Sequence, residues 1–166
     1  MFLWFLGTSV LAVWFVFRDE RFDYRFLCVG AIAPDVIDIW WGGARTFHSV
    51  VTSVVVLLGV MFATVNRRAA RRRALALPIG LFLHLVFDGA FGNTRVFWWP
   101  LAGTSFDGAR LPTAQRGLVN VFLELAGAVM LAWVWRHFAL ADSSRRRRFI
   151  ATGQLIDGAH GGAGTC

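Results

Sequence analysis

The sequence predicts an all-α membrane protein, a polytopic bundle of about five transmembrane helices. Three observations lead to this prediction. Apolar residues make up 57% of the 166 residues, and the mean hydropathy is +0.56. They come in blocks that are separated by short arginine-bearing segments, a pattern typical of membrane proteins. All 17 basic residues are arginine. Because most of them crowd beside apolar blocks, they favour helix orientation in a membrane over nucleic-acid binding, and no nucleic-acid partner is expected.

The apolar blocks define the expected helices, which cover residues 2–17, 26–41, 48–65, 75–91 and 118–140. The first, second and fourth blocks are short for a perpendicular span of about 20 residues, so we expect their ends to extend slightly. The first block lacks a basic leader and runs into Arg18–Arg21, which favours a retained helix over a cleaved signal peptide. We therefore divide the chain into a transmembrane domain, residues 1–141, and a flexible, basic, glycine-rich cytoplasmic tail, residues 142–166.

The arginines predict the orientation of the bundle. With five helices, the first connection, the third connection and the tail lie on one side, and these segments hold twelve arginines. The opposite side holds four, namely Arg45, Arg95, Arg110 and Arg116. The positive-inside rule makes the arginine-rich side cytoplasmic. The N-terminus is then outside and the C-terminus inside, in the cytoplasmic (inner) membrane of a bacterium or archaeon.

Five ionisable side chains lie in or beside the outer halves of the apolar blocks. Asp35 and Asp38 are three residues apart, and His84 and Asp88 are four apart, so each pair shares a helix face. At 1.5 Å per residue, the first pair lies roughly 14 and 18 Å from the inner end of its block, and the second pair roughly 14 and 20 Å. His48 opens the third block from the outer side. We therefore expect all five side chains to converge.

A mixed oxygen and nitrogen donor set of this kind suits a divalent metal, with zinc or manganese favoured and magnesium or iron as alternatives. Buried charges cost about 2.5–3.5 kcal/mol each and so need partners or a task. The structural alternative is a hydrogen-bonded network of these side chains, helped by Ser49, Thr52 or Asn93. Glu124, at a similar outer depth in the fifth block, is a further ligand, a base, or a partner of Arg116 or Asn120.

The motifs around these residues resemble a known family. The segments are Gly30-Ala31-Ile32-Ala33-Pro34-Asp35-Val36-Ile37-Asp38, His48-Ser49, His84-Leu85-Val86-Phe87-Asp88, Gly92 and Trp99-Pro100. Their order and spacing are similar to those of the membrane-bound, predicted metal-dependent hydrolases, which include the LexA-regulated, YdjM-like inner-membrane proteins. The resemblance implies a metal and catalytic centre of Asp35, Asp38, His48, His84 and Asp88. The chain departs from the family pattern at Gly43-Ala44 and Phe47, where a His-Arg pair and a threonine are common.

The expected function is therefore metal-dependent hydrolysis of a membrane lipid or lipid-linked phosphate or ester at the outer face. The bound metal would be held by Asp35, Asp38, His48, His84 and Asp88, and Asp38, His48 and Asp88 would take part in catalysis, with Asp38 as a candidate base. Arg45 or Arg95 would lie near an anionic head group. The alternative is a small non-enzymatic membrane protein that binds or conducts cations or protons, or that is a subunit of a larger complex. A homo-oligomer is compatible with either function.

Overall fold

A computed structural model describes residues 1–19, 21–40, 45–105 and 116–156, and these ranges carry every structural statement below. They contain helices and no strands, which confirms the all-α prediction. The α-helices are α1 (Phe2–Phe17), α2 (Tyr24–Ile39), α3 (Val50–Ala63), α4 (Arg68–Ala74), α5 (Ala76–Phe87), α6 (Thr94–Phe97), α8 (Val119–His137) and α9 (Ser143–Thr152). Two short 3-10 helices, η1 (Thr46–His48) and η2 (Ala90–Gly92), precede α3 and α6.

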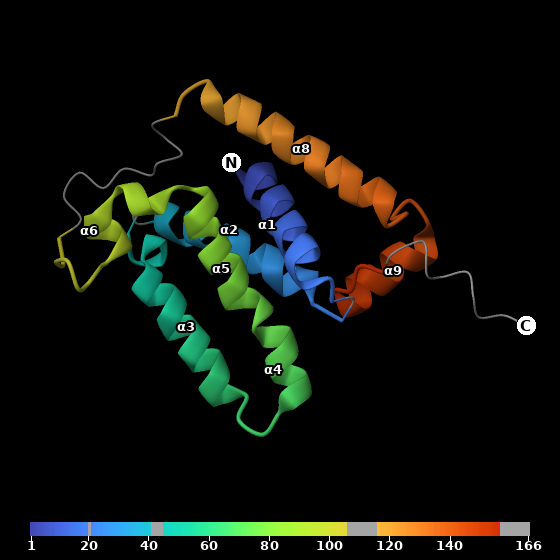
Figure 1. Ribbon diagram of the computed structural model, residues 1–166, viewed down its shortest axis with the longest axis horizontal. Coiled ribbons are helices and arrows are strands. Elements are labelled where there is room, and N and C mark those ends of the chain that lie inside the picture. Colours follow the sequence, from blue (N-terminus) through green and yellow to red (C-terminus); the bar gives the residue numbers. More distant parts are fainter. Residues whose placement is uncertain (20, 41–44, 106–115, 157–166) are drawn as a thin grey trace, which may run out of the picture.

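Each of the five expected apolar blocks forms a helix, α1, α2, α3, α5 and α8. The expected extension of the first, second and fourth is not seen, because α1 and α2 have 16 residues each and α5 has 12. The third connection differs from the expected loop, because Arg68–Ala74 forms α4. Alanine and arginine are strong helix formers, so a short arginine-rich segment can continue into α5 after a brief break. Figure 1 shows α6 at the left of the molecule, with α4 at the bottom and α9 at the right.

Helices α2 and α5 approach each other closely through two glycines. A Cβ atom on Gly30 of α2 would overlap the Leu77 carbonyl oxygen, and one on Gly80 of α5 would overlap the Leu27 carbonyl oxygen. Small residues at such positions let two helix backbones pack together. This contact sets the helix that carries Asp35 and Asp38 directly against the helix that carries His84.

Helix α8 also packs closely along α1 through a glycine, Gly127. A Cβ atom on Gly127 would overlap the backbone of Leu3 and Trp4 in the first turn of α1. Glu124, one turn earlier in α8, accepts a hydrogen bond of 3.0 Å from the Leu3 backbone N–H. The carboxylate therefore lies beside the start of α1, where helix N–H groups lack intrahelical partners.

The C-terminal segment is helical and packed over the part that the structure describes, unlike the flexible tail expected from Asp142. The Arg25 guanidinium donates hydrogen bonds to the carbonyls of Ile150 at 2.7 Å and Ala151 at 2.9 Å. The Gly153 carbonyl accepts one from the Tyr24 N–H at 2.8 Å, and Leu155 is only 2% exposed. A single buried leucine and three hydrogen bonds to backbone carbonyls thus hold a segment whose composition predicts disorder. Residues 157–166 lie outside the described ranges.

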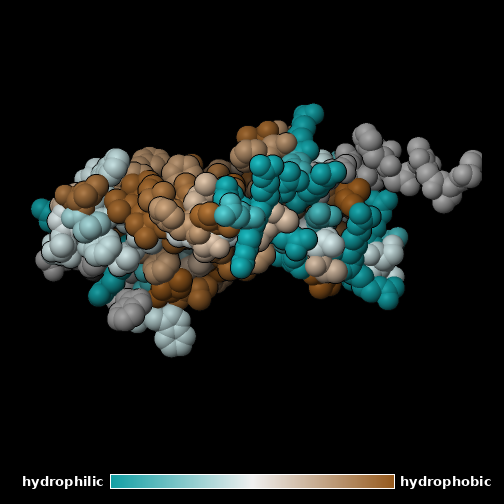
Figure 2. Space-filling view, turned by 90° about the horizontal axis from the view of Figure 1, so that it is seen from below, coloured by the Kyte–Doolittle hydropathy of each residue, from teal (hydrophilic) through white to brown (hydrophobic). Residues whose placement is uncertain are grey.

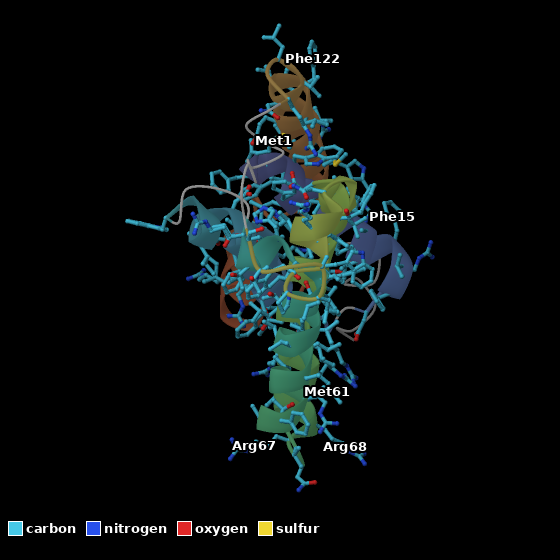
Figure 3. All side chains as sticks on the ribbon, turned by 90° about the vertical axis from the view of Figure 1, so that its left-hand side faces the viewer. Met1, Phe15, Met61, Arg67, Arg68 and Phe122 are labelled. Carbon is cyan, nitrogen blue, oxygen red and sulfur yellow. The ribbon has the colours of Figure 1, made fainter. Side chains whose placement is uncertain are left out.

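Large apolar side chains cover much of the surface. Figure 2 shows hydrophobic residues over the middle of the underside and hydrophilic residues gathered toward one end. In Figure 3, Phe122 of α8 lies at the top of the view, and it is 70% exposed. By length and composition, α8 is the one described helix that could cross a membrane, while α1 and α3 are apolar but shorter. The prediction of five spans stays a prediction.

Candidate metal centre

The C-terminal end of α2 supplies two carboxylates, which α5 and η1 bury. Asp35 is 7% exposed and Asp38 is 1% exposed. Pro34 lies inside the same turn, and because proline has no N–H, the helix loses one of its regular backbone hydrogen bonds there. The Gly30 carbonyl oxygen, four residues before Pro34, therefore lacks its usual helical N–H partner just below the two carboxylates.

His48 ends η1 and is completely buried. Its Nδ1 lies 2.7 Å from Asp38 Oδ2, and the same oxygen accepts the Arg45 backbone N–H at 2.9 Å. A carboxylate oxygen accepts hydrogen bonds, so the His48 Nδ1 donates to it, and in the neutral ring Nε2 then keeps a lone pair. That Nε2 faces Asp35, with 3.5 Å to its Oδ1.

His84, in the last turn of α5, has the same arrangement with a different partner. Its Nδ1 lies 2.8 Å from the carbonyl oxygen of Ala31 in α2. A carbonyl can only accept, so Nδ1 donates and the Nε2 lone pair again faces Asp35, 3.6 Å from its Oδ1. The Phe5 ring packs against the imidazole with centroids 4.0 Å apart, which keeps this side of the site apolar.

Three side-chain atoms from three segments thus lie around a common position. Asp35 Oδ1, His48 Nε2 and His84 Nε2 all lie within 4.8 Å of one another. Each is buried and has no hydrogen-bond partner among the described residues. Zinc ligands at about 2.0–2.1 Å from a tetrahedral centre lie about 3.3–3.4 Å from one another. The two measured separations from Asp35, 3.5 and 3.6 Å, are close to this value.

Asp88 follows α5 and is fully buried beside this group. Its Oδ2 lies 4.0 Å from His48 Nε2, and its Oδ1 lies 3.6 Å from Arg116 Nη1. Arg116 also donates a hydrogen bond to the Asp88 carbonyl oxygen. The guanidinium therefore holds both the backbone and the side chain of Asp88 and compensates one of the three buried carboxylates.

The structure brings together all five of the residues singled out from the sequence, through contacts that run from Asp38 to His48, from His48 to Asp35 and Asp88, and from Asp35 to His84. Their contacts differ. Asp35, His48 and His84 present free donor atoms, whereas Asp38 Oδ2 is engaged by His48 and by the Arg45 backbone. Metal-binding histidines usually donate their second N–H to a carboxylate or carbonyl, which is how Asp38 and Ala31 are placed.

The residues that could have helped a purely structural network make other contacts. Ser49 donates to the Trp99 carbonyl at 2.6 Å, and Thr52 donates to the Thr46 carbonyl at 2.6 Å. Asn93 accepts a hydrogen bond from the Val96 N–H at the start of α6. None of these contacts reaches the group of three donor atoms, and Glu124 lies instead at the start of α1.

Arg116 and the Ala31 carbonyl were not predicted as members of this site. Arg116 is 28 residues from Asp88. The sequence shows only that it lies just before the fifth apolar block, which does not indicate a contact with Asp88. The Ala31 carbonyl is a backbone group with no signal at all. No protein-family model matches the chain, and no curated protein or solved structure matches it.

Proposed function

We propose that this chain is a metal-dependent hydrolase of the membrane, in which Asp35, His48 and His84 hold one divalent metal ion. The observation that carries the proposal is the set of three buried donor atoms without hydrogen-bond partners among the described residues. Leaving such atoms unpaired costs free energy. A metal ion bound between them would remove that cost.

The donor set favours zinc or manganese. Two imidazole nitrogens and one carboxylate oxygen are ligands that zinc commonly takes in catalytic sites, where a fourth position stays open. Magnesium prefers oxygen ligands and is disfavoured by the two histidines, while iron is compatible with them. When bound, the metal would lower the pKa of a coordinated water and polarise the scissile bond.

The surrounding groups have two roles, orienting the two histidines and accepting a proton. Asp38 accepts the Nδ1 proton of His48 and the Ala31 carbonyl accepts that of His84, so both rings keep Nε2 directed at the same point. Asp88 Oδ2, 4.0 Å from His48 Nε2, is positioned to accept a proton from a nucleophilic water or to serve as a further ligand. This geometry favours Asp88 over Asp38 as the base, because Asp38 already accepts two hydrogen bonds.

A membrane setting is supported by the exposed apolar surface and by the distribution of charge. Contiguous exposed apolar surface of this kind marks a contact with a partner or with lipid. The site residues lie at the end of α2, before α3 and at the end of α5, whereas the arginine-rich segments lie at the other ends of these helices. With the arginines inside, the site belongs to the outer half of the membrane.

This position supports a lipid or lipid-linked phosphate or ester as the substrate. Arg116 and Arg95 lie in the segments that follow α5, on the same side as the site, where a negatively charged head group would be attracted. Asp35, whose side chain is 10% exposed, is the most accessible of the three donor residues and marks the direction from which a substrate would approach.

The experiment is a hydrolysis assay on the detergent-purified protein with a panel of lipid phosphomonoesters, phosphodiesters and carboxylic esters. We expect turnover of at least one class, loss of turnover after chelation, and recovery with zinc or manganese. Asp35→Asn should abolish turnover, and Asp142→Asn, a change of the same kind at the start of α9, should not. A protein that binds metal but hydrolyses none of these lipids would instead support the non-enzymatic alternative of cation or proton binding.

A further inference from the structure

The second charged feature of the molecule lies at the opposite end from the metal centre. Arg21, between α1 and α2, and Arg68, Arg72 and Arg73 of α4 line a cavity of about 360 Å³, together with Ala69 and Gln154. Four guanidinium groups from two segments far apart in the sequence therefore face one space. A third segment, the C-terminal stretch after α9, contributes Gln154 to the lining.

The arginines of this end fall into two groups by their contacts. Arg25 is paired with Asp23 at 2.8 Å, and Arg71 donates to the Thr64 carbonyl at 3.2 Å. These two arginines hold the fold together. The four arginines of the cavity make no side-chain hydrogen bond or ion pair with any described residue, and so no structural contact accounts for them.

The arrangement is unfavourable without a counterion. Arg68 and Arg72 are four residues apart on one face of α4, and like charges at this spacing repel each other. Ala69, between them on the cavity side, leaves room where a longer side chain would fill the space. Arg67 lies on a different side, and Figure 3 shows Arg67 and Arg68 leaving the foot of the molecule in opposite directions.

We propose that this cavity, here called the arginine pocket, binds a phosphate group through Arg21, Arg68, Arg72 and Arg73. Guanidinium groups match the geometry of phosphate oxygens and can donate two hydrogen bonds to each group. The Gln154 side chain adds an amide donor, and contacts of the neighbouring Gly153 carbonyl and Leu155 side chain hold the backbone on both sides of it.

Two sources of phosphate have this chemistry: the head group of an anionic lipid and a soluble phosphate compound. Basic pockets beside membrane helices on the cytoplasmic side are recognised sites for anionic lipid head groups. The inference does not depend on the metal centre, because no residue is shared between the two sites.

The test uses the full chain in nanodiscs of phosphatidylcholine, with two probes. Inorganic pyrophosphate is titrated by calorimetry, and phosphatidylglycerol is added to a second set of nanodiscs, where lipid retained by the protein is counted by native mass spectrometry. Pyrophosphate binding identifies a soluble ligand, and selective retention of phosphatidylglycerol identifies a lipid. If neither probe binds, the proposal is overturned.

Matched variants separate a built pocket from general attraction to positive charge. Arg68→Ala with Arg72→Ala should weaken binding of the effective probe at least tenfold, whereas Arg67→Ala with Arg147→Ala, which removes the same charge outside the pocket, should change it less than threefold. Arg68→Lys with Arg72→Lys should give an intermediate loss, because lysine keeps the charge without the planar fork. Equal weakening by the two alanine pairs would overturn the proposal, and circular dichroism checks that each variant stays helical.

Discussion

The Nδ1 atom of His48 lies 2.7 Å from Asp38 Oδ2, and this contact leaves the opposite nitrogen of the ring facing Asp35. Asp38 thus acts on the candidate metal centre through a histidine. The contact fixes which ring nitrogen carries the proton and which one can bind a cation.

Asp38→Asn therefore tests an orienting role. The asparagine oxygen can still accept the His48 proton, but the negative charge that makes the ring a better ligand is lost. We expect zinc affinity to fall about 10–100-fold, the range for such supporting groups. A competition titration with a chelator of known affinity measures this, with Asp142→Asn as the control at a distant helix start. An unchanged affinity would show that Asp38 does not support the metal.

Arg116 is expected to affect turnover more than metal binding. It contacts Asp88 and none of the three donor atoms, so Arg116→Gln should misplace the candidate base while Asp35, His48 and His84 keep the metal. We expect turnover to fall at least tenfold, in line with the contribution of general-base catalysis, with metal content unchanged. Arg147→Gln, at an exposed arginine of α9 with no role in the site, is the matched control. Loss of metal from Arg116→Gln would assign Asp88 to the ligands.

The close approach of α2 and α5 can be tested with two glycines. A Cβ at Gly30 would overlap the Leu77 carbonyl oxygen, so Gly30→Ala should push the helices apart and destabilise the protein by about 1–3 kcal/mol. Gly59 of α3 has open space around its Cβ position, and Gly59→Ala should be neutral or stabilising by roughly 0.5–1 kcal/mol. Thermal unfolding followed by circular dichroism compares the two. Equal stability of both variants would contradict the α2–α5 packing.

The arginine distribution predicts a topology that fusion reporters can measure. A reporter that works only in the cytoplasm should be active when it is fused after Cys166 or inserted between Arg67 and Arg68, and inactive when it is inserted at Gly103. Activity of an exported reporter at Cys166 would show that the bundle has the opposite orientation in the membrane. The metal centre would then belong to the inner half of the membrane.

The apolar blocks were sufficient to predict the five main helices, and residue spacing predicted the shared faces of Asp35 with Asp38 and of His84 with Asp88. The spacing was informative because residues three or four apart lie on one side of a helix. Residue type alone could not separate the roles of Asp35 and Asp38. That difference depends on the position of His48, which η1 sets and no local pattern indicates.

Other features depend on contacts between distant segments. The Ala31 carbonyl and Arg116 reach the site through the close packing of α2 with α5 and through a contact across 28 residues. The packing of the C-terminal segment depends on Arg25, which lies in α2, and on Leu155, a single residue in a stretch whose average composition predicts disorder. The composition of a segment is an average, so it does not predict the effect of one buried residue such as Leu155.

The central claim is that Asp35, His48 and His84 hold a metal ion, and the most direct test is the metal content of the purified protein by mass spectrometry after exposure to zinc and to manganese. We predict about one ion per chain for the wild type, as for a single site of three protein ligands. His84→Ala should lose the ion and remain folded by thermal unfolding, while His137→Ala, a histidine that stacks on Trp133 of α8, should keep it. A wild-type protein without metal, or a folded His84→Ala variant with its full metal content, would contradict the account.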